Sequence, residues 1–248
     1  MIDVYYHICA LGNWKEIVEY QFEVIVKSGL LAACDNIFIG FLGDNVSDIN
    51  FLSNRSSKIK VFAFSNYKEH CERLTLNAMR EKVIREKENK KIFYLHSKGV
   101  TRDLNEVKLW TDIMLYFLVE NFETCVKLLN IGDTVGVNAV NDGNSHHKID
   151  NETHCMCYSG NFWWTNSNHI RKLPKIPENP KNMIPNNLFW LTERWLLCKP
   201  GRFIEIYNSG YNHLYNIEPS KVKDYKQKFK KEFLALNYRN QLIRIPFH

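Results

Sequence analysis

Short apolar runs alternate with longer polar segments over the first 140 residues of this 248-residue chain. Each run is rich in β-branched and aromatic residues and is bounded by Gly, Asn or charged residues. This pattern predicts buried strands of an α/β sheet. The predicted strands are Val4–Ala10, Asn36–Leu42, Lys60–Phe64, Lys91–Leu95 and Thr134–Val140.

The segments between these strands carry apolar residues three and four positions apart, which is the spacing of one helix face. They predict helices over Trp14–Lys27, Tyr67–Lys87 and Asn105–Asn130, the first ending at the C-cap pair Ser28–Gly29. Strands that alternate with helices favour a mostly parallel central sheet flanked by helices.

The second half is richer in aromatic residues, Pro and Asn, and no Pro/Gly/Ser-rich linker separates it from the first. We therefore expect one domain over residues 1–218, with halves of about 1–140 and 141–218. Residues 219–248 form a separate tail.

The tail carries the net charge of the protein. Residues 219–248 contain eight Lys or Arg against Asp224 and Glu232, which equals the +6 of the whole chain. The body is therefore neutral, which argues against a nucleic-acid partner. An apolar stripe predicts a basic amphipathic helix, formed by Val222, Tyr225, Phe229, Phe233 and Leu236.

Two interpretations of this helix remain open. We favour a C-terminal helix docked on the domain, with its lysines in solvent. The alternative is peripheral contact of residues 221–236 with an anionic membrane.

Composition narrows the class of protein. Apolar residues make up 45% of the chain, enough for a sizeable core, and there is neither a long apolar run nor a signal-peptide pattern. Seven scattered Cys suggest reduced thiols, so we expect a cytoplasmic protein.

The segment KIFYLHSKGV, residues 91–100, is the first candidate for chemistry. Its strand ends on His96, Ser97 and Lys98, and open α/β sheets bind ligands at the carboxyl ends of their strands. Lys98 supplies a point charge suited to phosphate, and Gly99 lets a backbone approach closely. A strand cap with a solvated Lys explains the same residues.

The segment YSGNFWWT, residues 158–165, is the second. Gly160 and Asn161 predict a tight bend beside Trp163 and Trp164, and Trp faces with nearby amides commonly hold sugars. Core packing is the alternative, and it is favoured for one of the two Trp because adjacent strand residues face opposite sides.

Other polar residues are weaker candidates. Glu193, at the start of a helix in TERW, suits a general base, but the helix dipole alone also favours Glu there, and from these residues alone we favour the dipole explanation. His213 could bind phosphate, bind a metal or be structural. Zinc is a minority interpretation for a His/Cys cluster with unusual spacing: His146, His147, His154, Cys155 and Cys157.

Several motifs are absent. The chain lacks a G-x-G-x-x-G loop, a Walker loop, a G-x-S-x-G elbow and the Asp-x-Asp pair that usually holds a nucleotide-bound divalent ion.

Taken together, five segments resemble small glycosyltransferase-type proteins of bacteria and large DNA viruses, which have the GT-A (Rossmann-like) arrangement. These segments are ALGNW, YLHSKGV, VGVN, SGNFWWTNSNHIRKLP and TERW. The His-x-Lys strand end is similar to that of rhamnan synthesis F-type proteins. The resemblance spans roughly residues 3–215.

The resemblance implies a transferase that moves a sugar from a UDP-, GDP- or dTDP-sugar to a glycan, lipid-linked or protein-linked acceptor. Residues 1–140 would form the nucleotide-sugar half and 141–218 the acceptor half. The implied donor and phosphate residues are Ala10, Leu11, Gly12, Thr75, His96, Ser97, Lys98 and His213. The implied acceptor residues are Asn138, Gly160, Asn161, Trp163 and Trp164.

Glu193 would be the catalytic base, with Asp142 as second choice, and inversion is weakly favoured. Because Asp-x-Asp is missing, we expect no required metal, with Mn²⁺ or Mg²⁺ as the alternative. A non-catalytic carbohydrate- or nucleotide-binding module of the same fold is the competing function.

Overall fold

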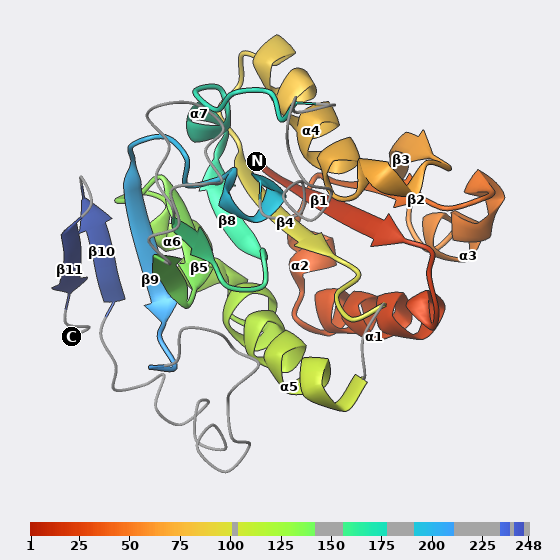
Figure 1. Ribbon diagram of the computed structural model, residues 1–248, viewed down its shortest axis with the longest axis horizontal. Helices are drawn as coiled ribbons and strands as arrows, with labels where there is room; N and C mark the ends of the chain where they lie inside the picture. The colour runs from red at the N-terminus through yellow and green to blue at the C-terminus, as the bar shows by residue number, and fades with distance from the viewer. Residues whose placement is uncertain (101–103, 142–155, 178–190, 211–233, 239–240, 246–248) are drawn as a thin grey trace.

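The computed structural model describes residues 1–100, 104–141, 156–177, 191–210, 234–238 and 241–245. Most of these residues surround one large sheet (Figure 1). Its strand order is β11-β10-β9-β5-β8-β4-β1-β2-β3. The strands are β1 (Ile2–Cys9), β2 (Asn36–Leu42), β3 (Ile59–Ser65), β4 (Lys91–His96), β5 (Thr134–Val137), β8 (Trp163–Asn166), β9 (Arg202–Tyr207), β10 (Leu234–Tyr238) and β11 (Gln241–Ile245).

The sheet is mostly parallel. Strands β1, β2, β3 and β4 pair in parallel, and so do β5 and β9. Strand β8 runs against both of its neighbours, β4 and β5, and β10 runs against β9 and β11. Seven of these nine strands therefore point the same way. A second small sheet pairs β6 (Ala139–Asn141) with β7 (Met156–Tyr158).

Helices cover both faces of the sheet, which confirms the predicted α/β class (Figure 1). Alternate residues of β1 enter different cores: Val4, Tyr6 and Ile8 pack on one face and Tyr5 on the other. The first face is covered by α1 (Trp14–Lys27), α2 (Leu30–Ala33), α3 (Asn50–Ser53), α5 (Leu104–Leu115), a π-turn (Tyr116–Glu120) and α6 (Phe122–Leu128). The second face is covered by α4 (Arg73–Arg85) and α7 (Ser167–Ile170).

Helix α1 shows why the sequence pattern was informative. Its residues Ile17, Val18, Phe22 and Ile25 recur at helical spacing and are buried. The helix ends where predicted, because Gly29 follows in the left-handed conformation, with φ of +84°.

Two predicted helices and one predicted strand are interrupted. The segment Tyr67–Lys87 divides into a 3₁₀ turn (Lys68–His70) and α4, because Cys71 between them has a φ of +46°. The π-turn divides Asn105–Asn130. Strand Thr134–Val140 breaks at Asn138, where φ is +45°.

The predicted C-terminal helix is wrong for its last three residues, 234–236. Leu236 lies in β10, which pairs with β9 and β11 and extends the main sheet. Alternation of Leu234 and Leu236 with Ala235 and Asn237 also fits a strand, and the open edge of β9 offers the pairing partner. The rest of the predicted helix and membrane segment, 221–233, lies outside the described residues.

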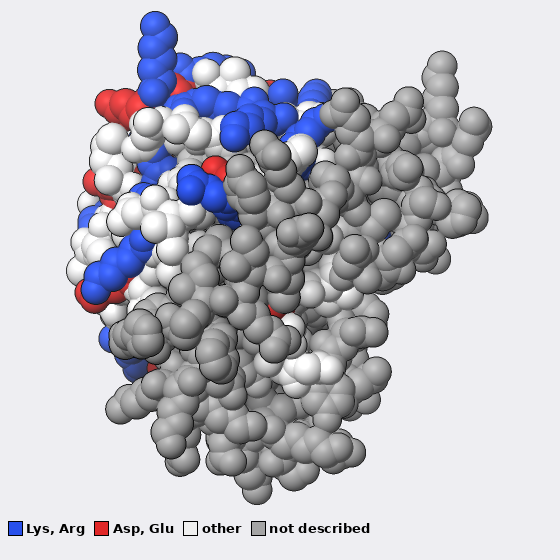
Figure 2. Space-filling model, turned by 90° about the vertical axis from the view of Figure 1, so that its left-hand side faces the viewer, with Lys and Arg blue, Asp and Glu red and all other residues white. Residues whose placement is uncertain are grey.

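Two further features concern possible membrane spans and the charge on one face of the molecule. No helix in the described ranges is long and apolar enough to cross a membrane. Figure 2 shows that Lys and Arg side chains on the described part of one face are mixed with Asp and Glu.

Candidate functional site

The strand order changes direction between β1 and β4. From β1 the chain adds β2 and β3 on one side of the sheet, and then β4 pairs with the opposite side of β1. In open α/β sheets the crevice outside the carboxyl ends of two such strands is the usual place for a ligand. Here those ends carry His7 and His96, which are paired in register.

A cavity of about 270 Å³ lies at this place. It is bounded by the ends of β1, β2 and β4 and by the turn before α4. Its lining residues are His7, Cys9, Leu11, Leu42, Lys68, Cys71, Glu72, His96, Ser97, Lys98, Gly99 and Val100. We refer to it as the switch-point cavity.

A buried carboxylate, Glu72, connects three segments beside this cavity. One oxygen lies 3.0 Å from Nδ1 of His96. The other accepts hydrogen bonds from the Tyr94 hydroxyl at 2.7 Å and the Asn161 amide at 2.6 Å. Burial acts to raise the pKa of Glu72, but the charge and hydrogen bond of His96 outweigh it, with His7 and Tyr94 contributing, and lower the pKa to about 2. Glu72 is therefore ionised.

His96 is held at both ring nitrogens. Nδ1 faces Glu72, and Nε2 lies 3.2 Å from the carbonyl oxygen of Gly160. The ring is therefore engaged by protein oxygens at both nitrogens. Its place fits a positioning residue better than the direct phosphate ligand that the sequence suggested.

The predicted bend at Gly160 and Asn161 is present, and it is tightly packed. Both residues have positive φ, +90° and +54°. A Cβ atom on Gly160 would lie 2.4 Å from Sδ of Met114 and 2.7 Å from Nε1 of Trp110. The side chain of Asn161 bonds Glu72 and accepts a hydrogen bond from Trp163, so the bend is fastened to the charged cluster.

Lys98 is a nearly buried cation, 8% exposed, at the cavity wall. Its Nζ lies 4.0 Å from the ring centroid of Trp110, a cation–π contact. The next residue, Gly99, turns the chain with a φ of +99°.

Glu193 joins the same group of charges. It belongs to a helical stretch, residues 191–194, and is partly exposed. Burial raises the pKa of Glu193, Glu72 reinforces this, and the positive charges of Lys98 and His96 oppose it. The predicted base is therefore within electrostatic reach of the predicted phosphate residues, although it lies about a hundred positions away in the sequence.

Ser97 and Thr75 have structural partners. Oγ of Ser97 accepts a hydrogen bond from the Cys9 amide at 2.9 Å, which ties β4 to β1. Thr75 is fully buried on α4, and its hydroxyl lies 2.8 Å from Nδ1 of His7. Burial lowers the pKa of His7 to about 4, so this ring is neutral at neutral pH.

Three of the implied donor residues, Ala10, Leu11 and Gly12, follow β1. Leu11 lines the switch-point cavity, whereas Ala10 and Gly12 are absent from its lining. The Ala10 amide donates to the carbonyl of Leu42, and a Cβ on Gly12 would lie 2.8 Å from the carbonyl oxygen of Val100.

Three of the predicted acceptor residues are packing residues instead. Trp163 stacks on Tyr94 and Trp164 on Phe93, and both Trp are almost fully buried. Asn138 is 1% exposed, and its side chain bonds the backbone and hydroxyl of Ser209. No face of either indole is open for a sugar, because adjacent strand residues here enter two cores rather than one core and one surface.

Asp142 and His213 lie outside the described residues, as do His146, His147, His154 and Cys155. Among the residues that the structure describes, no group of three or more His, Cys, Asp or Glu side chains is arranged to hold a metal ion.

Comparisons with known proteins give a family and distant structural likenesses. Residues 5–194 match the model of a family described as "Domain of unknown function (DUF8361)". No curated protein matches the chain.

Two solved structures are similar over nearly their whole length. HddC from Yersinia pseudotuberculosis has a TM-score of 0.46 and 12% identity, covering 92% of this chain and 100% of its own. The 4-diphosphocytidyl-2C-methyl-D-erythritol synthase from Anaerococcus prevotii has a TM-score of 0.41 and 12% identity, covering 90% of this chain and 98% of its own. At these values neither likeness assigns an activity.

Proposed function

We propose that this chain, which belongs to the DUF8361 family, is a glycosyltransferase that moves a sugar from a nucleotide-sugar donor to a hydroxyl acceptor. The observation that supports this most strongly is that Lys98 and His96 line the switch-point cavity and that both lie within electrostatic reach of Glu193. A cation for departing phosphates and a carboxylate for an attacking hydroxyl are the two groups that the reaction needs.

The charge of Lys98 suits the leaving group of the reaction. When the bond between the anomeric carbon and the donor phosphate breaks, negative charge develops on the diphosphate. A fixed positive charge in a partly enclosed site stabilises this charge more than water does. Lys98 supplies that charge directly, and the Glu72–His96 pair holds the adjacent wall in place.

Glu193 suits the base. In the proposed step its carboxylate takes the proton of the acceptor hydroxyl, the oxygen attacks the anomeric carbon, and the nucleoside diphosphate leaves with the bonding electrons. A carboxyl with a raised pKa is a stronger base than an ordinary one, and burial raises the pKa of Glu193. Direct attack inverts the anomeric configuration.

The substrates are proposed by class. The donor is a UDP-, GDP- or dTDP-sugar, and the acceptor is a glycan or glycoconjugate. Lys98 takes over the charge stabilisation that a metal ion usually gives, so we expect transfer to persist in EDTA.

The test compares three variants in a donor-consumption assay with EDTA present. Glu193→Gln is expected to lower turnover by ~10²–10⁴-fold, the usual contribution of a general base. Glu81→Gln, an exposed carboxylate on α4, is the matched control and should keep full turnover. Lys98→Met should lower it as well.

Each outcome decides something. A loss below about tenfold for Glu193→Gln would remove it as the base. Full turnover of Lys98→Met would remove the phosphate role. Nucleotide binding without any product from the unmodified protein would instead identify a non-catalytic binding module.

A further inference from the structure

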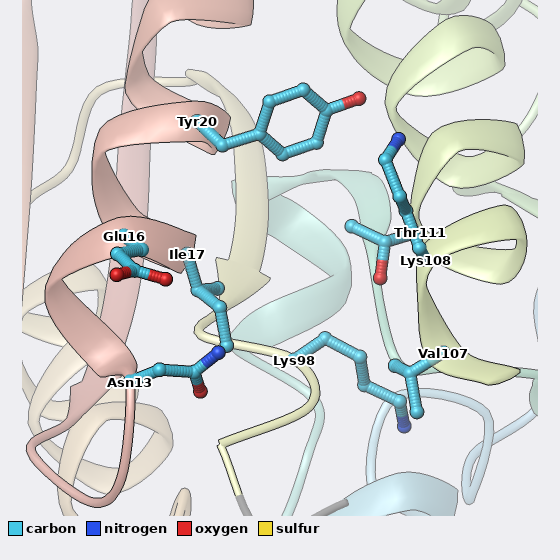
Figure 3. A pocket seen from close by; sticks show the side chains of 8 residues that line it. All are labelled: Asn13, Glu16, Ile17, Tyr20, Lys98, Val107, Lys108 and Thr111. Carbon is cyan, nitrogen blue, oxygen red and sulfur yellow. The ribbon is translucent and has the colours of Figure 1, made fainter. Parts of the chain in front are cut away.

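A second cavity lies between α1 and α5, directly beside the switch-point cavity. Its volume is about 190 Å³. Figure 3 shows its side chains arriving from both helices and from the turn after β4. They are Asn13, Glu16, Ile17, Tyr20, Lys98, Val107, Lys108 and Thr111. We refer to it as the interhelical cavity.

The wall of the interhelical cavity is mainly apolar. Ile17 and Val107 are buried side chains that meet the space from opposite helices, and the Tyr20 ring adds an aromatic surface. The polar groups of Asn13 and Glu16 lie on the α1 side. An apolar cavity of about 150 Å³ is enough to hold a benzene ring, so this space suits one six-membered ring or a short chain.

The two helices are tied together at one end of this cavity. The Tyr20 hydroxyl donates to Asp112 at 2.6 Å, and the Lys108 ammonium pairs with the other oxygen of Asp112 at 2.7 Å. The Lys108 ammonium also lies 4.9 Å from the centroid of the Tyr20 ring. These contacts join α1 to α5, so the space between them is a formed site.

Lys98 is the residue that the two cavities share. Polar atoms form a larger part of the wall of the switch-point cavity, whereas the exposed wall of the interhelical cavity consists almost entirely of apolar atoms. A transferase must hold two substrates whose reacting atoms meet. Two cavities of different chemistry with one cation between them provide that arrangement.

We propose that the interhelical cavity is the acceptor subsite and takes the apolar ring or short chain of a hydroxyl-bearing acceptor, with the hydroxyl directed toward Lys98. This rests on the proposed glycosyl transfer, in which the donor occupies the switch-point cavity. The donor's nucleobase is the competing occupant, and the test separates the two.

The probe is 4-fluorobenzyl alcohol, an apolar ring with one hydroxyl, observed by ¹⁹F NMR in a titration with the full chain. Saturable binding is expected, and glycerol at equal concentration should not displace it. Glu16→Trp and Thr111→Met fill the cavity from opposite helices, and each should weaken binding at least tenfold. Glu19→Trp, an exposed position on α1 that does not line the cavity, should change it less than twofold.

Three results would overturn the proposal. They are no saturable binding, binding of the probe by both filled variants as tightly as by the unmodified protein, and displacement of the probe by UDP, GDP and dTDP. The last result would assign the cavity to the nucleobase. Nucleotide binding is measured separately by thermal shift. If no nucleotide stabilises the protein while the probe still binds, the glycosyl-transfer function fails and the apolar binding site stands.

Discussion

At the scale of single residues, Glu72 is the group that organises the site, and the sequence did not reveal it. Its partners Tyr94, His96 and Asn161 come from β4 and from the bend before β8. In the sequence Glu72 is one of many charged residues in a polar segment. His96, Ser97 and Lys98 were predictable because they end a buried strand, a local pattern, whereas Glu72 acquires its role only through tertiary contacts.

Removing the charge of Glu72 should destabilise the fold strongly. Glu72→Gln keeps the shape but leaves His96 without its carboxylate partner, and breaking one side of a buried pair costs ~3–5 kcal/mol. Glu86→Gln is the control, because Glu86 pairs with Lys82 and Lys90 through a partly exposed carboxylate, and exposed pairs contribute at most about 1 kcal/mol each. Urea unfolding measures both. Equal, small losses would show that the buried pair does not hold the site together.

The pH dependence of stability should carry the signature of His7. Burial lowers its pKa from 6.5 to about 4. Between these values the unfolded chain binds a proton that the native protein does not. The free energy of unfolding should therefore fall as pH drops, by at most about 1.4 kcal/mol per pH unit for this residue. The loss attributable to Glu72 comes lower, between 4.5 and about 2.

The measurement is urea unfolding from pH 7 to pH 4 for the unmodified protein and His7→Gln. The variant should show a shallower slope. Some slope should remain, because burial also lowers the pKa of His169. Identical slopes in the two proteins would mean that His7 is protonated in the folded state.

At the scale of elements, strands and helices bounded by Gly or charge were predicted well, as α1 and β2 show. The breaks at Cys71 and Asn138 were not. Both residues adopt positive φ, which L-residues rarely do, and residue type did not mark either position. The place of β8 between β4 and β5 was also hidden, because a reversed strand inserted from later in the chain leaves no local signal.

Gly160 should be far less replaceable than Gly29. Both have positive φ, so Ala costs each roughly 1–2 kcal/mol for the backbone. A Cβ on Gly160 would also collide with Met114 and Trp110, whereas one on Gly29 meets nothing within 4 Å. The collision should add ~1–3 kcal/mol to the loss for Gly160→Ala. Unfolding curves of the two variants give the difference, and equal losses would exclude crowding at the bend.

At the scale of the whole molecule, the change in strand order determines where the site lies. The predicted order of strands and helices was enough to expect an α/β sheet, and the pairing of β1 with β4 then brings His7 and His96 together at the carboxyl ends of these strands. The pairing of β10 and β11 with this sheet was missed, because a stripe of apolar residues three and four positions apart outweighed a shorter alternating pattern in the tail.

The most direct test is calorimetric titration of UDP, GDP and dTDP into the protein in EDTA. The unmodified protein should bind at least one of them. Lys98→Met should weaken that binding about 10–100-fold, since a hydrogen bond to a charged group contributes ~1.5–3 kcal/mol. Lys108→Met, which changes a cation of the interhelical cavity only, should leave it unchanged. Equal affinities of the unmodified protein and Lys98→Met, or no binding of any nucleotide, would contradict a donor site at the switch-point cavity.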